Sequence, residues 1–275
     1  MPRKIPATMI AGLSGVFFGA ALLTACSTGE VDPADSSINP FTENRPQQKK
    51  AGNRDISLQP YLREAAAQAG ESLDYASAAA YWGAIFNSNP GDKAAALQYA
   101  RNLRYSNDAE SAIKVLNKAL EMQPGDTQLL AERAKAAASI GAFEQALPDI
   151  DKAIAADQND WALHSARGVL LDRLNRQSDA ETSYNQALAL SPDNPKVLNN
   201  LALSLALSGR KEEAVAQMRR AAAHPGASLQ IRQNLSLLLA MQGNVHEANQ
   251  IAKADLPANM AEGNTAYFQG LQAAE

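Results

Sequence analysis

The chain has 275 residues, of which 46% are hydrophobic and 5% aromatic, and its formal net charge at pH 7 is −4. This negative charge provides no basic field for a polynucleotide, and Lys49-Lys50 is too short a basic run to provide one. Composition therefore argues against nucleic-acid binding as the function.

The N-terminus has the pattern of an export signal. Arg3 and Lys4 precede an apolar stretch over residues 9–25, which is too short and too glycine-rich for a transmembrane helix. Small residues stand just before Cys26, where such a signal is cleaved. We predict that residues 1–25 are a signal peptide and take no part in the fold.

The end of this signal, Leu23-Thr24-Ala25-Cys26, resembles the bacterial lipobox. The resemblance implies that Cys26 is lipidated on its thiol and becomes the first residue of the mature protein. Cys26 is the only cysteine, and an ordinary secretory signal with an incidental cysteine is the alternative. Ser27 replaces the aspartate that marks inner-membrane retention in enterobacterial lipoproteins, so the analogy implies an anchor in the outer membrane, facing the periplasm.

Residues 26–58 follow as a polar segment with three prolines and no apolar period. This composition is typical of a disordered tether. A flexible chain of this length has an r.m.s. span of roughly 30 Å, so the folded part can work away from the bilayer surface.

From residue 59 the chain repeats every 34 residues. The strictest ladder is made of alanines at Ala78, Ala112, Ala146, Ala180, Ala214 and Ala248. In repeats that begin at Gln59, Lys93, Thr127, Trp161, Pro195 and Leu229, the eighth residue is also always small. A period of 34 is that of the tetratricopeptide repeat, so we predict an all-α solenoid. Its six repeats span 59–262, and a capping helix spans 263–275.

The fifteenth residue of each repeat marks the end of its first helix. Five of the six repeats have glycine or asparagine there, which tolerate the left-handed backbone that ends a helix, but the first has Leu73. The sixth repeat has Asp255 where a small apolar residue belongs. Terminal repeats have one neighbour instead of two, so we expect these two repeats to fray first.

No catalytic constellation emerges from the sequence. The three histidines, His164, His224 and His246, lack the spacing of metal ligands, and no glycine-rich phosphate loop follows a strand. His164 occupies an apolar packing position and is expected to be structural, as is Trp82 between the helices. We therefore expect neither enzyme activity nor a cofactor or metal.

A solenoid of this kind offers a concave groove lined by its first helices, suited to an extended peptide or a partner helix. Positions two, five, six, nine and twelve of each first helix should face it. The candidate residues are Gln98, Arg101, Arg104, Gln128, Glu132, Lys135, Asp172, Lys196, Asn199, Asn200, Leu203, Gln233, Asn234 and Leu237. Asn200 and Asn234 stand one repeat apart and could hold a peptide backbone, whereas Leu203 and Leu237 could grip side chains. The alternative is that all these residues form an ordinary solvated face.

The tail provides the most specific pattern. It reads Ala254-Asp255-Leu256-Pro257, then Ala258-Asn259-Met260, then Asn264-Thr265-Ala266-Tyr267-Phe268. Together with the lipobox, tether and six repeats, it resembles the TadD family of tetratricopeptide lipoproteins from the Tad (tight adherence) pilus system. Tyr267 and Phe268 are also expected to be exposed, since no repeat obviously buries them.

This resemblance implies a non-enzymatic outer-membrane lipoprotein that is needed for assembly of Tad/Flp pili. Its expected partners are the secretin or other Tad components. A different periplasmic adaptor, for outer-membrane protein insertion or peptidoglycan hydrolases, remains the alternative, because the same fold serves many functions.

Overall fold

The computed structural model describes residues 58–273, which form helices and contain no strand. The helices are α2 (Gln59–Glu71), α3 (Tyr75–Ser88), α4 (Lys93–Tyr105), α5 (Ala109–Met122), α6 (Thr127–Ser139), α7 (Phe143–Ala156), α8 (Trp161–Arg173), α9 (Gln177–Leu190), α10 (Pro195–Leu207), α11 (Lys211–Ala223), α12 (Leu229–Met241), α13 (Val245–Asp255) and α14 (Ala258–Ala273). The predicted signal peptide, Cys26 and residues 26–57 of the predicted tether lie outside the described residues. None of the described helices is long and apolar enough to cross a membrane.

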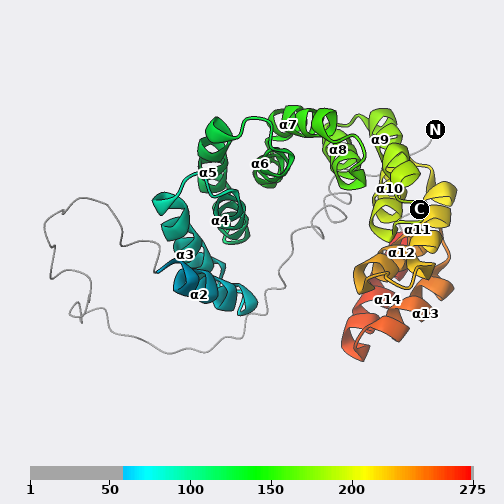
Figure 1. The fold of residues 1–275 in the computed structure, drawn as a ribbon. Helices are drawn as coiled ribbons and strands as arrows, with labels where there is room; N and C mark the ends of the chain where they lie inside the picture. Colours follow the sequence, from blue (N-terminus) through cyan, green and yellow to red (C-terminus); the bar gives the residue numbers. More distant parts are fainter. Residues whose placement is uncertain (1–57, 274–275) are drawn as a thin grey trace, which may run out of the picture. The chain divides into compact units, whose positions relative to one another are not determined.

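The helices pair into six helical hairpins, and the sixth is followed by α14 (Figure 1). The first helix of each hairpin begins at the residue that the 34-residue register predicts, from Gln59 in α2 to Leu229 in α12. First helices also contact one another across repeats, α4 with α6, α8 with α10 and α10 with α12. The predicted solenoid of helix-turn-helix repeats is confirmed.

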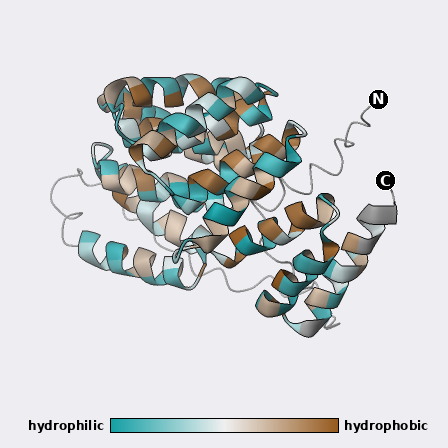
Figure 2. Cartoon of the chain, turned by 90° about the vertical axis from the view of Figure 1, so that its right-hand side faces the viewer, coloured by the Kyte–Doolittle hydropathy of each residue, from teal (hydrophilic) through white to brown (hydrophobic). Residues whose placement is uncertain are grey.

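Small residues lie where helices cross. All six alanines of the strict ladder are 0% exposed, and the eighth residue of every repeat is buried as well. Figure 2 shows hydrophobic and hydrophilic residues interspersed along each helix, as expected when only one stripe of a helix faces the core. Close crossing leaves no volume for a larger side chain at these positions.

A residue with positive φ stands two residues after the end of every first helix. The six residues and their φ angles are Leu73 (59°), Asn107 (65°), Gly141 (78°), Asn175 (58°), Gly209 (80°) and Gly243 (90°). Leu73 therefore adopts the conformation of its glycine and asparagine counterparts, although an L side chain with a branched γ-carbon disfavours it. The stacking of the repeats imposes this turn even where the residue is unsuited to it.

The side chain before each first helix from α4 onward caps that helix. The capping residues are Asp92, Asp126, Asp160, Asn194 and Ser228, each accepting a hydrogen bond from a backbone N–H of the first turn. They satisfy donors that helices leave unpaired at the N-terminus. The sequence patterns of small residues and turn residues did not include this series of capping residues, although it has the same 34-residue period. At the equivalent position before α2, Leu58 makes no such bond.

The capping helix starts earlier than expected, at Ala258 instead of residue 263. Leu256 is extended, as residues before proline usually are, so α13 stops there, and the Pro257 carbonyl accepts the first bonds of the next helix. The helix contacts both α12 and α13. It buries Phe268, which is 3% exposed, so the expectation that Phe268 is accessible was wrong; Tyr267 is 53% exposed.

Candidate partner-binding face

We define the first-helix face as positions two, five, six, nine and twelve of α4, α6, α8, α10 and α12. Seven of the fourteen predicted binding residues lie in two polar clusters on this face. One joins α4 to α6 and the other joins α8, α10 and α12. Outside them, Gln128 and Lys196 are exposed, and Leu203 and Leu237 pack, partly buried, against the core.

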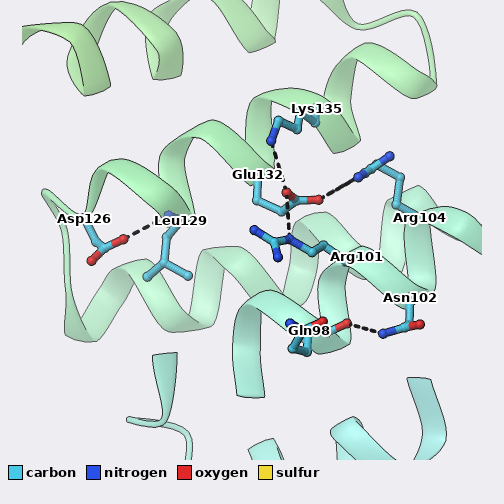
Figure 3. A network of polar contacts seen from close by, with 8 residues as sticks. All are labelled: Gln98, Arg101, Asn102, Arg104, Asp126, Leu129, Glu132 and Lys135. Carbon is cyan, nitrogen blue, oxygen red and sulfur yellow. Dashed lines mark hydrogen bonds and ion pairs between the residues drawn. The ribbon is translucent and has the colours of Figure 1, made fainter. Parts of the chain in front are cut away.

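The first cluster, the arginine–glutamate cluster, consists of Arg101, Arg104, Glu132 and Lys135. Figure 3 shows the three cationic side chains converging on the Glu132 carboxylate, which lies on α6. Arg104 donates from Nε and Nη2 to Oε1 of Glu132 at 3.1 and 3.0 Å, and Arg101 donates from Nε to Oε2 at 3.4 Å. Lys135 Nζ lies 3.6 Å from Oε2.

Burial divides these cations into two roles. The Glu132 and Arg104 side chains are 2% and 8% exposed, whereas those of Arg101 and Lys135 are 40% and 53% exposed. A buried carboxylate needs a close cation, and Arg104 provides it. Arg101 and Lys135 therefore present their charge to solvent, and the cluster as a whole has three cations for one carboxylate.

Two amide side chains lie beside this cluster on α4. Asn102 is buried and donates from Nδ2 to the Gln98 backbone carbonyl at 2.8 Å, so it is structural (Figure 3). Gln98, one of the predicted binding residues, is partly buried. Within residues 58–273 its side-chain amide has no hydrogen-bond partner, which leaves it available to a ligand.

The second cluster, the asparagine chain, consists of Ser165, Asn200, Asn199 and Asn234. Asn234 donates to Asn199 at 2.8 Å, Asn199 to Asn200 at 3.2 Å, and Asn200 to Ser165 at 3.4 Å. Asn199 and Asn234 are each 6% exposed, whereas Asn200 is only partly buried. These amides join three first helices, and of the three, Asn200 is the most accessible. Their binding of a peptide backbone stays a prediction.

Gln233 is likewise engaged within the chain. Its amide nitrogen donates to Asp255 at 3.5 Å, and its oxygen accepts from Asn264 of α14 at 3.4 Å. Asp255 also accepts from Nε of Arg232 at 2.9 and 3.0 Å. The aspartate that breaks the small-residue pattern thus pairs with a cation, and Gln233 helps to hold the cap.

Asp172, the predicted binding residue of α8, is held by two hydroxyls. Tyr184 Oη donates to Oδ2 at 2.8 Å and Ser204 Oγ to Oδ1 at 2.7 Å. Burial raises the pKa of the Asp172 carboxyl, although both hydrogen bonds oppose that shift. Burial and the neighbouring carboxylate also raise the pKa of the Tyr184 hydroxyl. Tyr184 fits because Gly168 faces its ring, where an added Cβ would lie 2.5 Å from it.

His164 and Trp82, both expected to be structural, are buried or partly buried and contact other residues of the repeats. His164 is 8% exposed; its Nε2 lies 3.0 Å from the Gln158 carbonyl and its Nδ1 3.2 Å from Gln186 Oε1. Trp82 is partly buried, with the Arg63 guanidinium 5.4 Å from its ring centroid. Among residues 58–273 no three histidine, cysteine, aspartate or glutamate side chains are grouped to hold a metal ion.

Comparison with known proteins supports the repeat assignment. Residues 97–160 and 165–228 match the tetratricopeptide repeat family model. A tetratricopeptide repeat protein from Parabacteroides merdae is 17% identical over 79% of this chain and 89% of its own, with a TM-score of 0.61. A thermophilic tetratricopeptide repeat protein from Thermus thermophilus is 23% identical over 66% of this chain and 98% of its own, with a TM-score of 0.58.

The MamA protein is also similar, at 15% identity over 61% of this chain and 91% of its own, with a TM-score of 0.51. No curated protein matches the chain at a significant level. At these identities the likeness establishes a shared fold, and function has to be argued from the surface of this chain.

Proposed function

Because the chain is a tetratricopeptide-repeat solenoid, we propose that it is a non-enzymatic scaffold that binds other proteins through its first-helix face. The observation that carries this proposal is the arginine–glutamate cluster, where two exposed cations stand on a rigid helical platform. Each repeat stacks only on its neighbours, so the face of the first helices stays open along the array. Such a surface suits an extended peptide or an amphipathic helix.

We further propose that this scaffold is an outer-membrane lipoprotein, anchored through Cys26, that assists assembly of the Tad/Flp pilus by acting on its secretin. The proposal rests on the lipobox, the polar tether, the six repeats and the tail, whose combination resembles the TadD family. A tether of about 30 Å would let the repeats reach a large envelope complex while the lipid stays in the membrane.

Deletion and complementation in the source bacterium test this role. The deletion strain is expected to have few pili and few secretin multimers, and the wild-type gene restores both. Full piliation with normal secretin multimers in the deletion strain would contradict the pilus role. Normal pili combined with altered outer-membrane protein levels or altered peptidoglycan would indicate the other kind of envelope adaptor.

A further inference from the structure

We propose that the first-helix face of α4 and α6 binds an acidic segment of the partner, with an aspartate or glutamate side chain of that segment against Arg101 and Lys135. The inference rests on the proposed protein-binding function and specifies the chemistry of the partner. The arginine–glutamate cluster carries it, because that cluster offers more cationic donors than the protein itself uses.

The hydrogen bonds of Glu132 show which donors are spare. Its Oε1 accepts two hydrogen bonds from Arg104, at 3.1 and 3.0 Å, whereas its Oε2 has only the 3.4 Å bond from Arg101 and the 3.6 Å ion pair with Lys135. In the part of the chain that the structure describes, Nη1 and Nη2 of Arg101 have no acceptor, and Lys135 pairs with no other carboxylate. Both side chains can therefore bind a further anion without losing a strong internal bond.

Glu132 also positions these donors. Its carboxylate is nearly fully buried and is fixed by Arg104. Arg101 of α4 and Lys135 of α6 therefore lie on either side of the same carboxylate oxygen, Oε2 (Figure 3). The planar guanidinium of arginine suits a carboxylate, and lysine adds a point charge beside it.

Charge distribution favours an acidic partner at this place. The cluster carries two more positive than negative charges, although the whole chain has a net charge of −4. An acidic segment is therefore repelled by the protein as a whole and attracted here, which orients its docking. Around the cations, Gln98 offers an amide, and Ala131, Ala138 and Ala166 are small, partly buried residues on the same face. An extended acidic segment can lie close to such a surface.

The test measures binding of labelled peptides to the full chain by fluorescence anisotropy. The probe is a short peptide with Asp and Glu alternating with Ala and Leu and an amidated C-terminus. One control has Asn and Gln in place of the acids, and a second has the same amides but a free C-terminal carboxylate. We expect only the acidic peptide to bind, and more weakly as salt rises from about 50 to about 300 mM. Arg101→Gln combined with Lys135→Gln should weaken its binding about tenfold or more.

Arg219→Gln combined with Arg220→Gln provides the matched charge control, because it also removes two cations. Both residues lie on the second helix α11, with side chains 49% and 53% exposed, against 40% and 53% for Arg101 and Lys135. This variant removes the same kind of charge and should change affinity by less than about twofold, since exposed charges away from the contact contribute little. Both target side chains are exposed, so circular dichroism is expected to show an unchanged fold for all variants.

Three results would overturn the proposal: equal binding of the acidic and amide peptides, undiminished binding by the Arg101→Gln/Lys135→Gln variant, or binding only of a peptide with a free C-terminal carboxylate. The third would identify a chain terminus and not an acidic side chain as the ligand. These outcomes are independent of the pilus role. Loss of pili in the deletion strain together with no acidic-peptide binding would refute this inference alone, and the reverse combination would refute the pilus role alone.

Discussion

Replacing Leu73 with glycine should stabilise the first repeat. Leu73 has φ of 59°, a left-handed conformation that costs an L-residue about 1–2 kcal/mol. Leu73 is 68% exposed, so little packing is lost on truncation. Glycine offsets part of the gain, because it loses about 0.5–1 kcal/mol more conformational entropy on folding. We expect a net gain of about 0.5–1 kcal/mol in the free energy of unfolding of this repeat.

The positions of the two tryptophans allow the stability of the first repeat to be measured separately. Trp82 lies in the first repeat and Trp161 begins the fourth, so a Trp161→Phe background leaves Trp82 as a local fluorescent probe. In urea unfolding followed by Trp82 fluorescence, Leu73→Gly should move the midpoint to higher denaturant. The slope of the transition should stay the same, because the surface exposed on unfolding does not change.

Gly141→Ala is the reverse control. Its φ is 78° and an added Cβ would meet nothing within 4 Å, so conformation alone sets the penalty. It should destabilise the array, whereas Ile140→Gly, at a half-exposed neighbour with negative φ, should not stabilise it. An unchanged or lower midpoint for Leu73→Gly would refute the view that the turn conformation at Leu73 is imposed at a cost.

Three other predictions concern single sites. Gly168→Ala should destabilise the array by about 1–3 kcal/mol in urea unfolding, because its Cβ would lie 2.5 Å from the Tyr184 ring; the Tyr184→Leu background, which removes the ring, should reduce that penalty. The raised pKa of Asp172 means that the folded protein holds this proton more tightly than the unfolded chain does, so its contribution to stability is greatest below the unfolded pKa and declines as pH rises through the folded pKa. The free energy of unfolding should depend less on pH across this range in Asp172→Asn than in the wild-type protein. Identical pH profiles for the two proteins would contradict a raised pKa at Asp172. Cys26→Ser should move the protein out of the membrane fraction while the repeats stay folded, and a variant that remains membrane-bound to the same extent would contradict the lipid anchor.

The sequence by itself determined the repeat architecture. The alanine ladder, the small eighth residue and the turn residues each reflect a steric requirement of one helical hairpin, and sterics of this kind are visible as residue size at a fixed period. The register was accurate to the residue for all six first helices. The capping ladder from Asp92 to Ser228 was equally local and could have been found the same way.

The candidate site was predictable only in part. Periodicity placed Arg101, Lys135 and Asn234 on one face, but it could not tell that Arg101 and Lys135 are exposed and Asn234 is buried. Burial of a face position depends on how closely the next first helix approaches and on which long side chain reaches across to it. Arg104 meets Glu132 28 residues away, and Asn234 meets Asn199 35 residues away.

The same limit explains the tail. Phe268 looked accessible because no repeat obviously buries it, yet α14 packs against α12 and α13 and buries the ring. A 34-residue period specifies what each hairpin needs in order to stack, since those contacts recur in every repeat. Contacts that are made only once, such as the Glu132 ion pairs or the packing of Phe268, produce no 34-residue pattern in the sequence, so only the packed tertiary structure decides them.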